Sequence, residues 1–206
     1  MNFYRLGRFV ACNFLRLFLR ISYEGTCNIP QEGSFILACN HRSFCDPIVI
    51  AHRVRRQIHY IAKAELVGIP VLGRIIRGLG VIPVKRGSGD GGVLDAAVEV
   101  VEKGGILGIF PEGTRSRDGK PLRPRSGVCV IAGKARADIL PCAVSYPPGG
   151  ARLFARVTVR YGPLIKKEEL NIDPDSPSAV RAGARAIMDA IVGLLDNPAV
   201  PGGDGP

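Results

Sequence analysis

Residues 35–47, FILACNHRSFCDP, place an apolar run before a polar loop and a helix-start signal. Phe35–Cys39 is apolar throughout, which predicts a buried strand. Asp46 followed by Pro47 is typical of a helix start, with Asp46 as the N-cap and Pro47 at the first helical position. We therefore expect a strand, a short loop and a helix over Asp46–Val54.

The polar loop contains a histidine and ends at a carboxylate. His41 directly follows the strand, and the loop allows its imidazole to meet Asp46. A carboxylate on one imidazole nitrogen fixes the tautomer and stabilises the imidazolium, while the other nitrogen is free to take a proton. The pair is therefore a candidate general base with its orienting group. The alternative from these residues alone is that Asp46 only caps a helix and His41 is a loop residue.

Short apolar runs and helical stretches alternate along the rest of the chain. This alternation predicts one α/β layered domain over residues 22–196, with two small domains as the alternative for 206 residues. The further strands are expected over His59–Ala62, Val81–Val84, Ile106–Phe110, Leu140–Ser145 and Leu153–Tyr161, and the further helices over Val93–Lys103, Gly127–Arg136 and Ser178–Leu195. The tail 197–206, NPAVPGGDGP, is rich in Pro and Gly and is expected to be disordered.

Two more polar clusters each follow an expected strand. FPEGTRS (110–116) combines backbone N–H groups, the Thr114 hydroxyl and the Arg115 guanidinium in one turn, which suits an anion. GVIPVKRG (80–87) ends in two cations, the second of them Arg86. Ligand sites in α/β sheets gather at the carboxyl ends of strands, so we expect these clusters to converge with the first. The alternative for 110–116 is an exposed polar turn.

Taken together, these motifs resemble the glycerolipid acyltransferase family, the 1-acyl-sn-glycerol-3-phosphate acyltransferases. NHRSFCDP (40–47) resembles the family's first block, NHxxxxD. VIPVKR (81–86), FPEGTRS (110–116) and ILPCAV (139–144) are similar to the second, third and fourth blocks in the same order, and AKAEL (62–66) looks like a further family segment. The resemblance covers roughly residues 22–165. It implies a single-domain layered fold with a mostly parallel or mixed sheet flanked by helices.

The resemblance also implies an activity. It indicates an enzyme of phospholipid biosynthesis that moves a fatty acyl group from acyl-CoA or acyl carrier protein to the sn-2 hydroxyl of 1-acyl-glycerol-3-phosphate, giving phosphatidic acid. Another lysolipid or glycerol-3-phosphate is the alternative acceptor. In this scheme His41 is the catalytic base and Asp46 orients it. An acyl thioester is already activated, so we expect no covalent nucleophile, no metal and no bound cofactor.

The remaining candidate site residues hold the substrates. Arg115, Arg86 and Lys63 are expected to bind the acceptor phosphate. The resemblance implies that Glu112 takes part in acceptor binding. It would either contact the glycerol or hold Arg115 in place. Backbone N–H groups around Gly113 are expected to serve the oxyanion.

Residues 1–21, MNFYRLGRFVACNFLRLFLRI, predict an amphipathic helix. The arginines form one face of this helix: Arg5, Arg8, Arg16 and Arg20. Apolar residues form the opposite face: Phe3, Val10, Phe14, Leu17 and Phe18. Phe9 and Leu19 do not fit this division. The arginines argue against a transmembrane helix and a signal peptide. We expect the helix to lie in a lipid interface, on the cytoplasmic face of a membrane, in a peripheral or monotopic protein. The alternative is that its apolar face packs on the domain core.

The charge balance favours anionic partners. Lys and Arg number 28 against 18 Asp and Glu, a net charge of +10. Such a field suits an anionic membrane surface, nucleic acid or a polyphosphate, and a merely basic soluble surface is the alternative. Aromatic content of 6% without Trp argues against base stacking, so no nucleic-acid partner is expected.

A glycine-rich segment supports an alternative type of site. GSGDGG (87–92) satisfies G-x-G-x-x-G before a helix, and Glu112 follows about 20 residues later, so a nucleotide-dependent oxidoreductase is an alternative. Two cations between strand and glycines argue against it, and it leaves the histidine–aspartate pair without a role. The six cysteines show no ligand-like spacing, which predicts free thiols in a reduced cytosolic setting.

Overall fold

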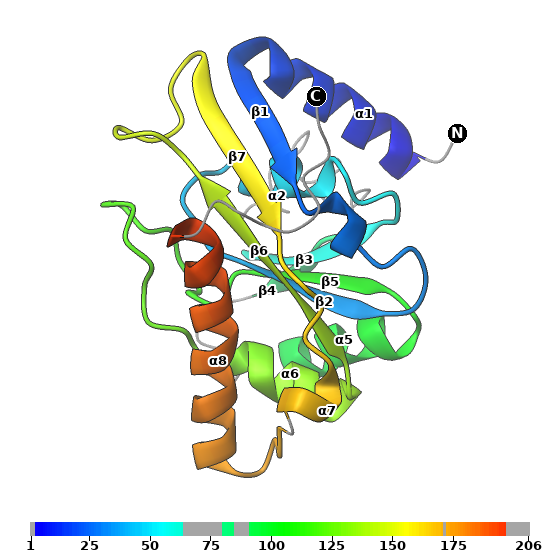
Figure 1. Ribbon diagram of the computed structural model, residues 1–206. Helices are drawn as coiled ribbons and strands as arrows, with labels where there is room; N and C mark the ends of the chain where they lie inside the picture. Colours follow the sequence, from blue (N-terminus) through cyan, green and yellow to red (C-terminus); the bar gives the residue numbers. More distant parts are fainter. Residues whose placement is uncertain (1–2, 64–79, 85–90, 171, 197–206) are drawn as a thin grey trace.

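A seven-stranded sheet forms the centre of the computed structural model, which describes residues 3–63, 80–84, 91–170 and 172–196 (Figure 1). Its spatial order is β1-β7-β6-β2-β5-β3-β4. The strands are β1 (Leu19–Glu24), β2 (Phe35–Cys39), β3 (Ile58–Lys63), β4 (Ile82–Val84), β5 (Ile106–Ile109), β6 (Asp138–Ser145) and β7 (Ala155–Tyr161). The helices are α1 (Phe3–Phe18), α2 (Asp46–Ala51), α5 (Gly91–Glu102), α6 (Gly127–Ala135), α7 (Lys167–Leu170) and α8 (Pro177–Asp196), with a 3₁₀ turn at Thr26–Asn28.

The strand directions decide which segments meet at each edge of the sheet. Strands β6, β2, β5, β3 and β4 run parallel, whereas β7 is antiparallel to β6 and β1 is parallel to β7. The carboxyl ends of the five parallel strands therefore lie at the same edge as the amino ends of β7 and β1. We call this the carboxyl edge. The predicted α/β layered fold with a mostly parallel sheet is confirmed.

Both faces of the sheet are covered by helices, which explains the uniformly apolar sequence of β2. All five β2 side chains are buried. Ile36 and Ala38 belong to the core shared with α5, α6 and α8, whereas the alternate residues Phe35, Leu37 and Cys39 face α2. The long helix α8 and the helices α5 and α6 lie on one side of the sheet in Figure 1.

The N-terminal helix is shorter than predicted, and a strand follows it. The helix expected over residues 1–21 ends at Phe18, and Leu19–Glu24 forms β1 against β7. The predicted domain boundary at residue 22 therefore falls inside a strand. The alternation of Leu19, Ile21 and Tyr23 carried a strand signal, but the partner strand lies more than a hundred residues later in the chain.

Helix α1 packs with a mixed face inward. Arg8 donates to the carbonyl oxygens of Ala51, the last residue of α2, and Val54, three residues further on. The carboxyl end of a helix favours a cation. The backbone N–H of Ile58 donates to the Tyr4 hydroxyl over 3.2 Å, and Cys12 is buried beside α2. These contacts anchor α1 to the domain.

The apolar face of α1 points to solvent instead. Its large hydrophobic side chains are 39–68% exposed: Leu6, Phe9, Val10, Phe14, Leu17 and Phe18. The alternative in which this face packs on the core is therefore wrong. Phe9, expected to break the amphipathic pattern, belongs to the exposed apolar face, whereas Arg8 leaves the expected basic face and turns inward.

None of the helices in the described part of the chain is both long and apolar enough to cross a bilayer. The predicted free thiols are confirmed: all six cysteines are free, and four of them are buried. The tail 197–206 lies outside the described residues.

The docking of α1 gives a stability prediction with an internal control. Arg8→Ala should lower the free energy of unfolding by about 1–3 kcal/mol, because the carbonyl oxygens of Ala51 and Val54 lose a charged donor. Arg16→Ala, on the exposed side of the same helix, should change it by less than about 0.5 kcal/mol. Urea unfolding followed by circular dichroism measures both, and equal effects would contradict the Arg8 anchor.

Candidate functional site

A histidine–aspartate pair lies at the carboxyl edge, directly after β2. The His41 Nδ1 atom is 2.8 Å from Asp46 Oδ2, and Asp46 is fully buried. A carboxylate only accepts hydrogen bonds, so Nδ1 carries the proton and the neutral imidazole has its lone pair on Nε2. The imidazole is also stacked on Phe110, with ring centroids 4.0 Å apart. The pair therefore has the geometry of an oriented general base.

Asp46 holds the loop around it rather than the helix after it. Its Oδ2 atom accepts from the backbone N–H groups of Arg42, at 2.6 Å, and Ser43, at 2.8 Å. Helix α2 begins at Asp46 itself, and its N-cap, Cys45, makes no side-chain capping bond. The prediction that Asp46 is the N-cap is wrong, because its carboxylate turns back to donors that precede the helix.

Tyr146, immediately after β6, completes the set of donors to Asp46. Its hydroxyl donates to Oδ1 over 2.6 Å, and the residue is 6% exposed. Burial, followed by the neighbouring Asp46 charge, raises the pKa of Tyr146 well above its ordinary value, so the hydroxyl stays protonated and donates. Sequence analysis missed this residue, since its partner lies 100 positions away.

Asn40 joins the ends of β2 and β6. Its side chain accepts from Val144 N–H at 2.7 Å and donates to Val144 O at 3.0 Å, so the amide imitates a strand partner. The residue is 2% exposed. Asn40 therefore fixes the position from which His41 leaves the sheet, a role that the motif alone did not indicate.

Glu112 braces the backbone of the site. It is 3% exposed, and its two oxygens accept from the backbone N–H groups of His41, at 2.7 Å, and Leu122, at 2.9 Å. Burial raises the pKa of this carboxyl above its ordinary value, against the lowering effect of the two backbone hydrogen bonds. Of the two predicted roles, bracing Arg115 is not observed: the carboxylate holds His41 and the following loop instead.

The turn after β5 brings the second predicted cluster next to the first. Ser116 N–H donates to His41 O over 2.8 Å, which fastens the turn to the histidine. Gly113 has φ +68 and its N–H donates to Phe110 O over 2.9 Å. The N–H of Gly113 itself is therefore used inside the turn, and the oxyanion role of the backbone N–H groups around it stays a prediction.

A cationic cavity opens beside the pair. It has a volume of about 280 Å³ and is lined by Arg42, Thr114, Arg115, Ser116 and Arg117. The Arg115 guanidinium lies 3.5 Å over the centroid of the exposed Phe44 ring. The predicted convergence of the first and third motifs is therefore confirmed.

Arg42 is a cation of this cavity that sequence analysis did not single out. Its guanidinium donates to Tyr146 O over 3.4 Å and lies 5.8 Å from the centroid of the Tyr146 ring. A side chain at Gly119 would collide with the same guanidinium. Arg42 is thus fixed between the loop after β5 and the end of β6, facing the cavity next to His41.

The second motif is only partly within the described residues. Lys63 ends β3, beside β4, at the carboxyl edge, and its side chain is outside the description. Arg86 and most of the glycine-rich loop 87–92 also lie outside it. The nucleotide alternative needs Glu112 to bind a ribose. In the structure Glu112 is buried, and its two oxygens already accept from two backbone N–H groups.

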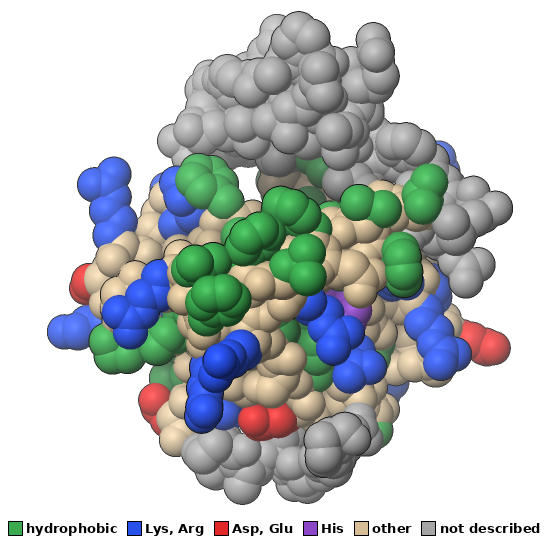
Figure 2. All heavy atoms as spheres, turned by 90° about the horizontal axis from the view of Figure 1, so that it is seen from above, with side chains coloured by type: hydrophobic (Ala, Val, Ile, Leu, Met, Phe, Trp, Pro, Cys, Tyr) green, Lys and Arg blue, Asp and Glu red, His purple; other side chains and the backbone are tan. Residues whose placement is uncertain are grey.

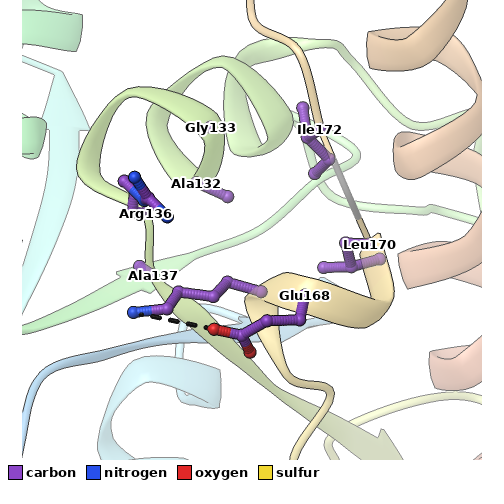
Figure 3. Close-up of a pocket in the computed structure, with 8 residues that line it drawn as sticks. Ala132, Gly133, Arg136, Ala137, Glu168, Leu170 and Ile172 are labelled. Carbon is purple, nitrogen blue, oxygen red and sulfur yellow. Dashed lines mark ion pairs between the residues drawn. The ribbon is translucent and has the colours of Figure 1, made fainter.

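Another cavity, of about 410 Å³, lies at the amino end of β6, between α6 and α7 (Figure 3). It is lined by Ala132, Gly133, Arg136, Ala137, Lys167, Glu168, Leu170 and Ile172. Lys167 and Glu168 form an ion pair of 3.9 Å there. Among the described residues, none of those predicted for the site lines this cavity.

Comparison with known proteins agrees with this site. The family profile described as Acyltransferase matches residues 20–145, which include both motifs. The 1-acyl-sn-glycerol-3-phosphate acyltransferase of Bacillus subtilis is 32% identical over 130 residues, 63% of this chain and 64% of that protein. The chloroplastic 1-acyl-sn-glycerol-3-phosphate acyltransferase LPAT1 of Arabidopsis thaliana is 32% identical over 127 residues, 60% of this chain and 35% of that protein. The chain thus matches less than two thirds of the length of these relatives.

A solved structure shares the fold. The crystal structure of the 1-acyl-sn-glycerophosphate (LPA) acyltransferase PlsC from Thermotoga maritima superposes with a TM-score of 0.75 at 26% identity. The match covers 94% of this chain and 80% of that one. The similarity therefore extends beyond the motifs to almost the whole chain.

The bracing role of Glu112 is open to a stability measurement. Glu112→Gln should lower the free energy of unfolding by about 1–3 kcal/mol at neutral pH, because one of two buried N–H groups then faces an amide NH₂. Thr114→Ala, exposed in the same turn, should change it by less than about 0.5 kcal/mol. Chemical unfolding of both variants measures the difference, and an unaffected Glu112→Gln protein would argue against the brace.

Proposed function

Because the chain belongs to the acyltransferase family, we propose that it transfers a fatty acyl group from a thioester to the sn-2 hydroxyl of 1-acyl-glycerol-3-phosphate, giving phosphatidic acid. One observation carries the proposal: an oriented His41–Asp46 pair adjoins a cavity lined by three guanidinium groups. A base next to an anion site is what a phosphate-bearing alcohol needs to become a nucleophile. The named relatives support the choice of acceptor.

His41 acts as general base and then as general acid. Its Nε2 atom takes the proton of the acceptor hydroxyl while the oxygen attacks the thioester carbonyl carbon. Asp46 stabilises the resulting imidazolium through Nδ1, at 2.8 Å. The tetrahedral intermediate then expels the thiolate, which takes the proton from Nε2 and leaves as a free thiol. No covalent enzyme intermediate and no metal enters this scheme.

Arg115 and Arg42 hold the acceptor phosphate in the proposed complex. Both line the cavity that adjoins His41, and guanidinium groups bind phosphate oxygens in pairs. Lys63 and Arg86 contribute from β3 and the segment after β4. Fixing the phosphate brings the hydroxyl to Nε2, and such positioning can remove roughly 7–11 kcal/mol of barrier. Another lysolipid or glycerol-3-phosphate presents the same phosphate–hydroxyl pair and is the alternative acceptor.

The donor is a fatty acyl thioester of coenzyme A or of acyl carrier protein. The reacting carbonyl is the same in both, and the exposed cations around the cavity suit either polyphosphate or an acidic protein surface. The net charge of +10 favours both for the same reason.

The reaction takes place at a lipid surface on the cytoplasmic side of a membrane. The exposed apolar face of α1 fits the acyl–headgroup boundary, with Arg16 and Arg20 exposed nearby to meet anionic lipid. The mixed face of the helix stays on the domain, so binding is peripheral or monotopic.

Replacing the base tests the mechanism. His41→Ala should lower kcat by roughly 10²–10⁴-fold with little change in acceptor KM, because general-base catalysis acts on the transition state. His52→Ala, at the other end of α2 from Asp46, is the control and should retain activity. A radiolabelled acyl-transfer assay measures both, and a folded His41→Ala enzyme with near-normal turnover would remove the assignment.

The phosphate contact makes a separate prediction. Arg115→Ala should raise the KM for the lysophospholipid by about 10- to 100-fold, the loss expected for one charged hydrogen-bonding partner. The KM for the acyl thioester should stay the same. Arg185→Ala, exposed on α8, is the matched control. An unchanged acceptor KM in the Arg115 variant would contradict the phosphate site.

A further inference from the structure

A second apolar element shares the carboxyl edge with α1. The loop between β6 and β7, residues 146–154 (YPPGGARLF), ends in Leu153 and Phe154, which are 62% and 58% exposed. Exposed large hydrophobic side chains of the described residues fall in three places only: six on α1, these two, and Phe44 beside the cavity. Such clustering marks an interaction surface rather than chance exposure.

The loop is fastened to the end of α1. Phe154 N–H donates to Phe18 O over 2.6 Å, and the next residue, Ala155, pairs with Leu19 in the sheet. Phe14 and Phe18 form an edge-to-face pair with centroids 4.9 Å apart. We call the combined exposed surface of Phe14, Leu17, Phe18, Leu153 and Phe154 the apolar wedge.

The backbone holds the tip in an unusual conformation. Phe154 has φ +58, in the left-handed region that a bulky side chain rarely adopts. Gly149 and Gly150, with φ +85 and +77, supply the turn that leads to it. Such strain persists only where neighbouring structure fixes it, here through Phe18 and the start of β7.

The wedge and the His41–Asp46 pair lie at the same edge of the sheet. The loop leaves β6 at Tyr146, whose hydroxyl reaches Asp46 over 2.6 Å, so its base belongs to the site. The antiparallel turn into β7 and the β1–β7 pairing bring the end of α1 to this edge. In the view from above, hydrophobic and Lys or Arg side chains share the face on which a histidine is visible (Figure 2).

The charges around the wedge select an anionic lipid surface over an apolar protein partner. Arg16, Arg20 and Arg152 are exposed in its two segments. Within residues 3–24 and 146–156 the sequence contains one carboxylate, Glu24, and it pairs with Arg160 at 2.7 Å. Exposed apolar side chains in segments that carry exposed arginines and almost no carboxylates are the pattern of interfacial membrane binding.

We propose that the tip of the β6–β7 loop is a second membrane anchor, which inserts Leu153 and Phe154 beside the end of α1 into an anionic bilayer. Helix α1 and this loop together hold the carboxyl edge at the membrane surface. The hydroxyl of an acceptor in the bilayer can then reach His41. The inference rests on the proposed reaction at a membrane, but vesicle binding is measured without turnover.

Vesicle co-sedimentation tests the loop. Leu153→Ser/Phe154→Ser should bind phosphatidylglycerol–phosphatidylcholine vesicles roughly tenfold or more weakly than wild type, since two exposed apolar side chains lose their insertion. Leu153→Met/Phe154→Leu, which keeps apolar side chains, should restore most of the binding. Phe14→Ser/Leu17→Ser reports on α1 separately. Urea unfolding shows that each variant is folded.

Fluorescence gives a second readout because the chain contains no tryptophan. Phe154→Trp should shift its emission to the blue on adding the anionic vesicles, whereas Ala182→Trp, exposed on α8, should not. Wild-type binding by the serine loop variant, or water-like emission from Phe154→Trp on bound vesicles, would overturn the second anchor. If the loop variant binds like wild type but the α1 variant binds more weakly, α1 is the anchor and the loop is not. If both serine variants bind vesicles like wild type, neither segment binds the membrane. Acyl transfer to a short-chain, water-soluble acceptor tests the chemistry independently of all of these outcomes.

Discussion

The buried carboxylate of Asp46 is the interaction on which the site depends. It receives hydrogen bonds from the His41 imidazole, from two backbone N–H groups of the same loop, and from the Tyr146 hydroxyl. A carboxylate removed from water is tolerated when donors replace its hydration, so loss of one donor disturbs the others. The loop after β2, the end of β6 and the base are thereby held as one unit.

Two further hydrogen bonds connect FPEGTRS (110–116) to His41. The Glu112 carboxylate accepts from His41 N–H, and the His41 carbonyl oxygen accepts from Ser116 N–H. His41 is therefore fixed through its ring, its N–H and its carbonyl by three different partners. Arg115, next to Ser116, is carried to the base by these bonds and stays exposed to meet a substrate.

The sheet directions bring together the chemistry and the surface that we assign to lipid. The central strands end where β7 and β1 begin, so the end of α1 and the β6–β7 loop lie at the edge that carries His41. Sequence analysis found the amphipathic N-terminal segment and most strands within a few residues. It placed the end of α1 too late and did not find β1, because the pairing that creates this strand is with residues 155–160.

The sequence by itself determined the α/β layering, the buried β2 strand and the short loop that allows His41 to meet Asp46. These depend on hydrophobic period and on spacing within a few residues, and both are local. Only the tertiary structure decided that Asp46 binds preceding N–H groups instead of capping α2, that Glu112 braces His41, and that Arg42 and Tyr146 belong to the site. It also decided which face of α1 remains in solvent. The physical reason is that hydrogen bonds and burial between segments about a hundred residues apart depend on how strands are ordered in the sheet, which no local pattern encodes.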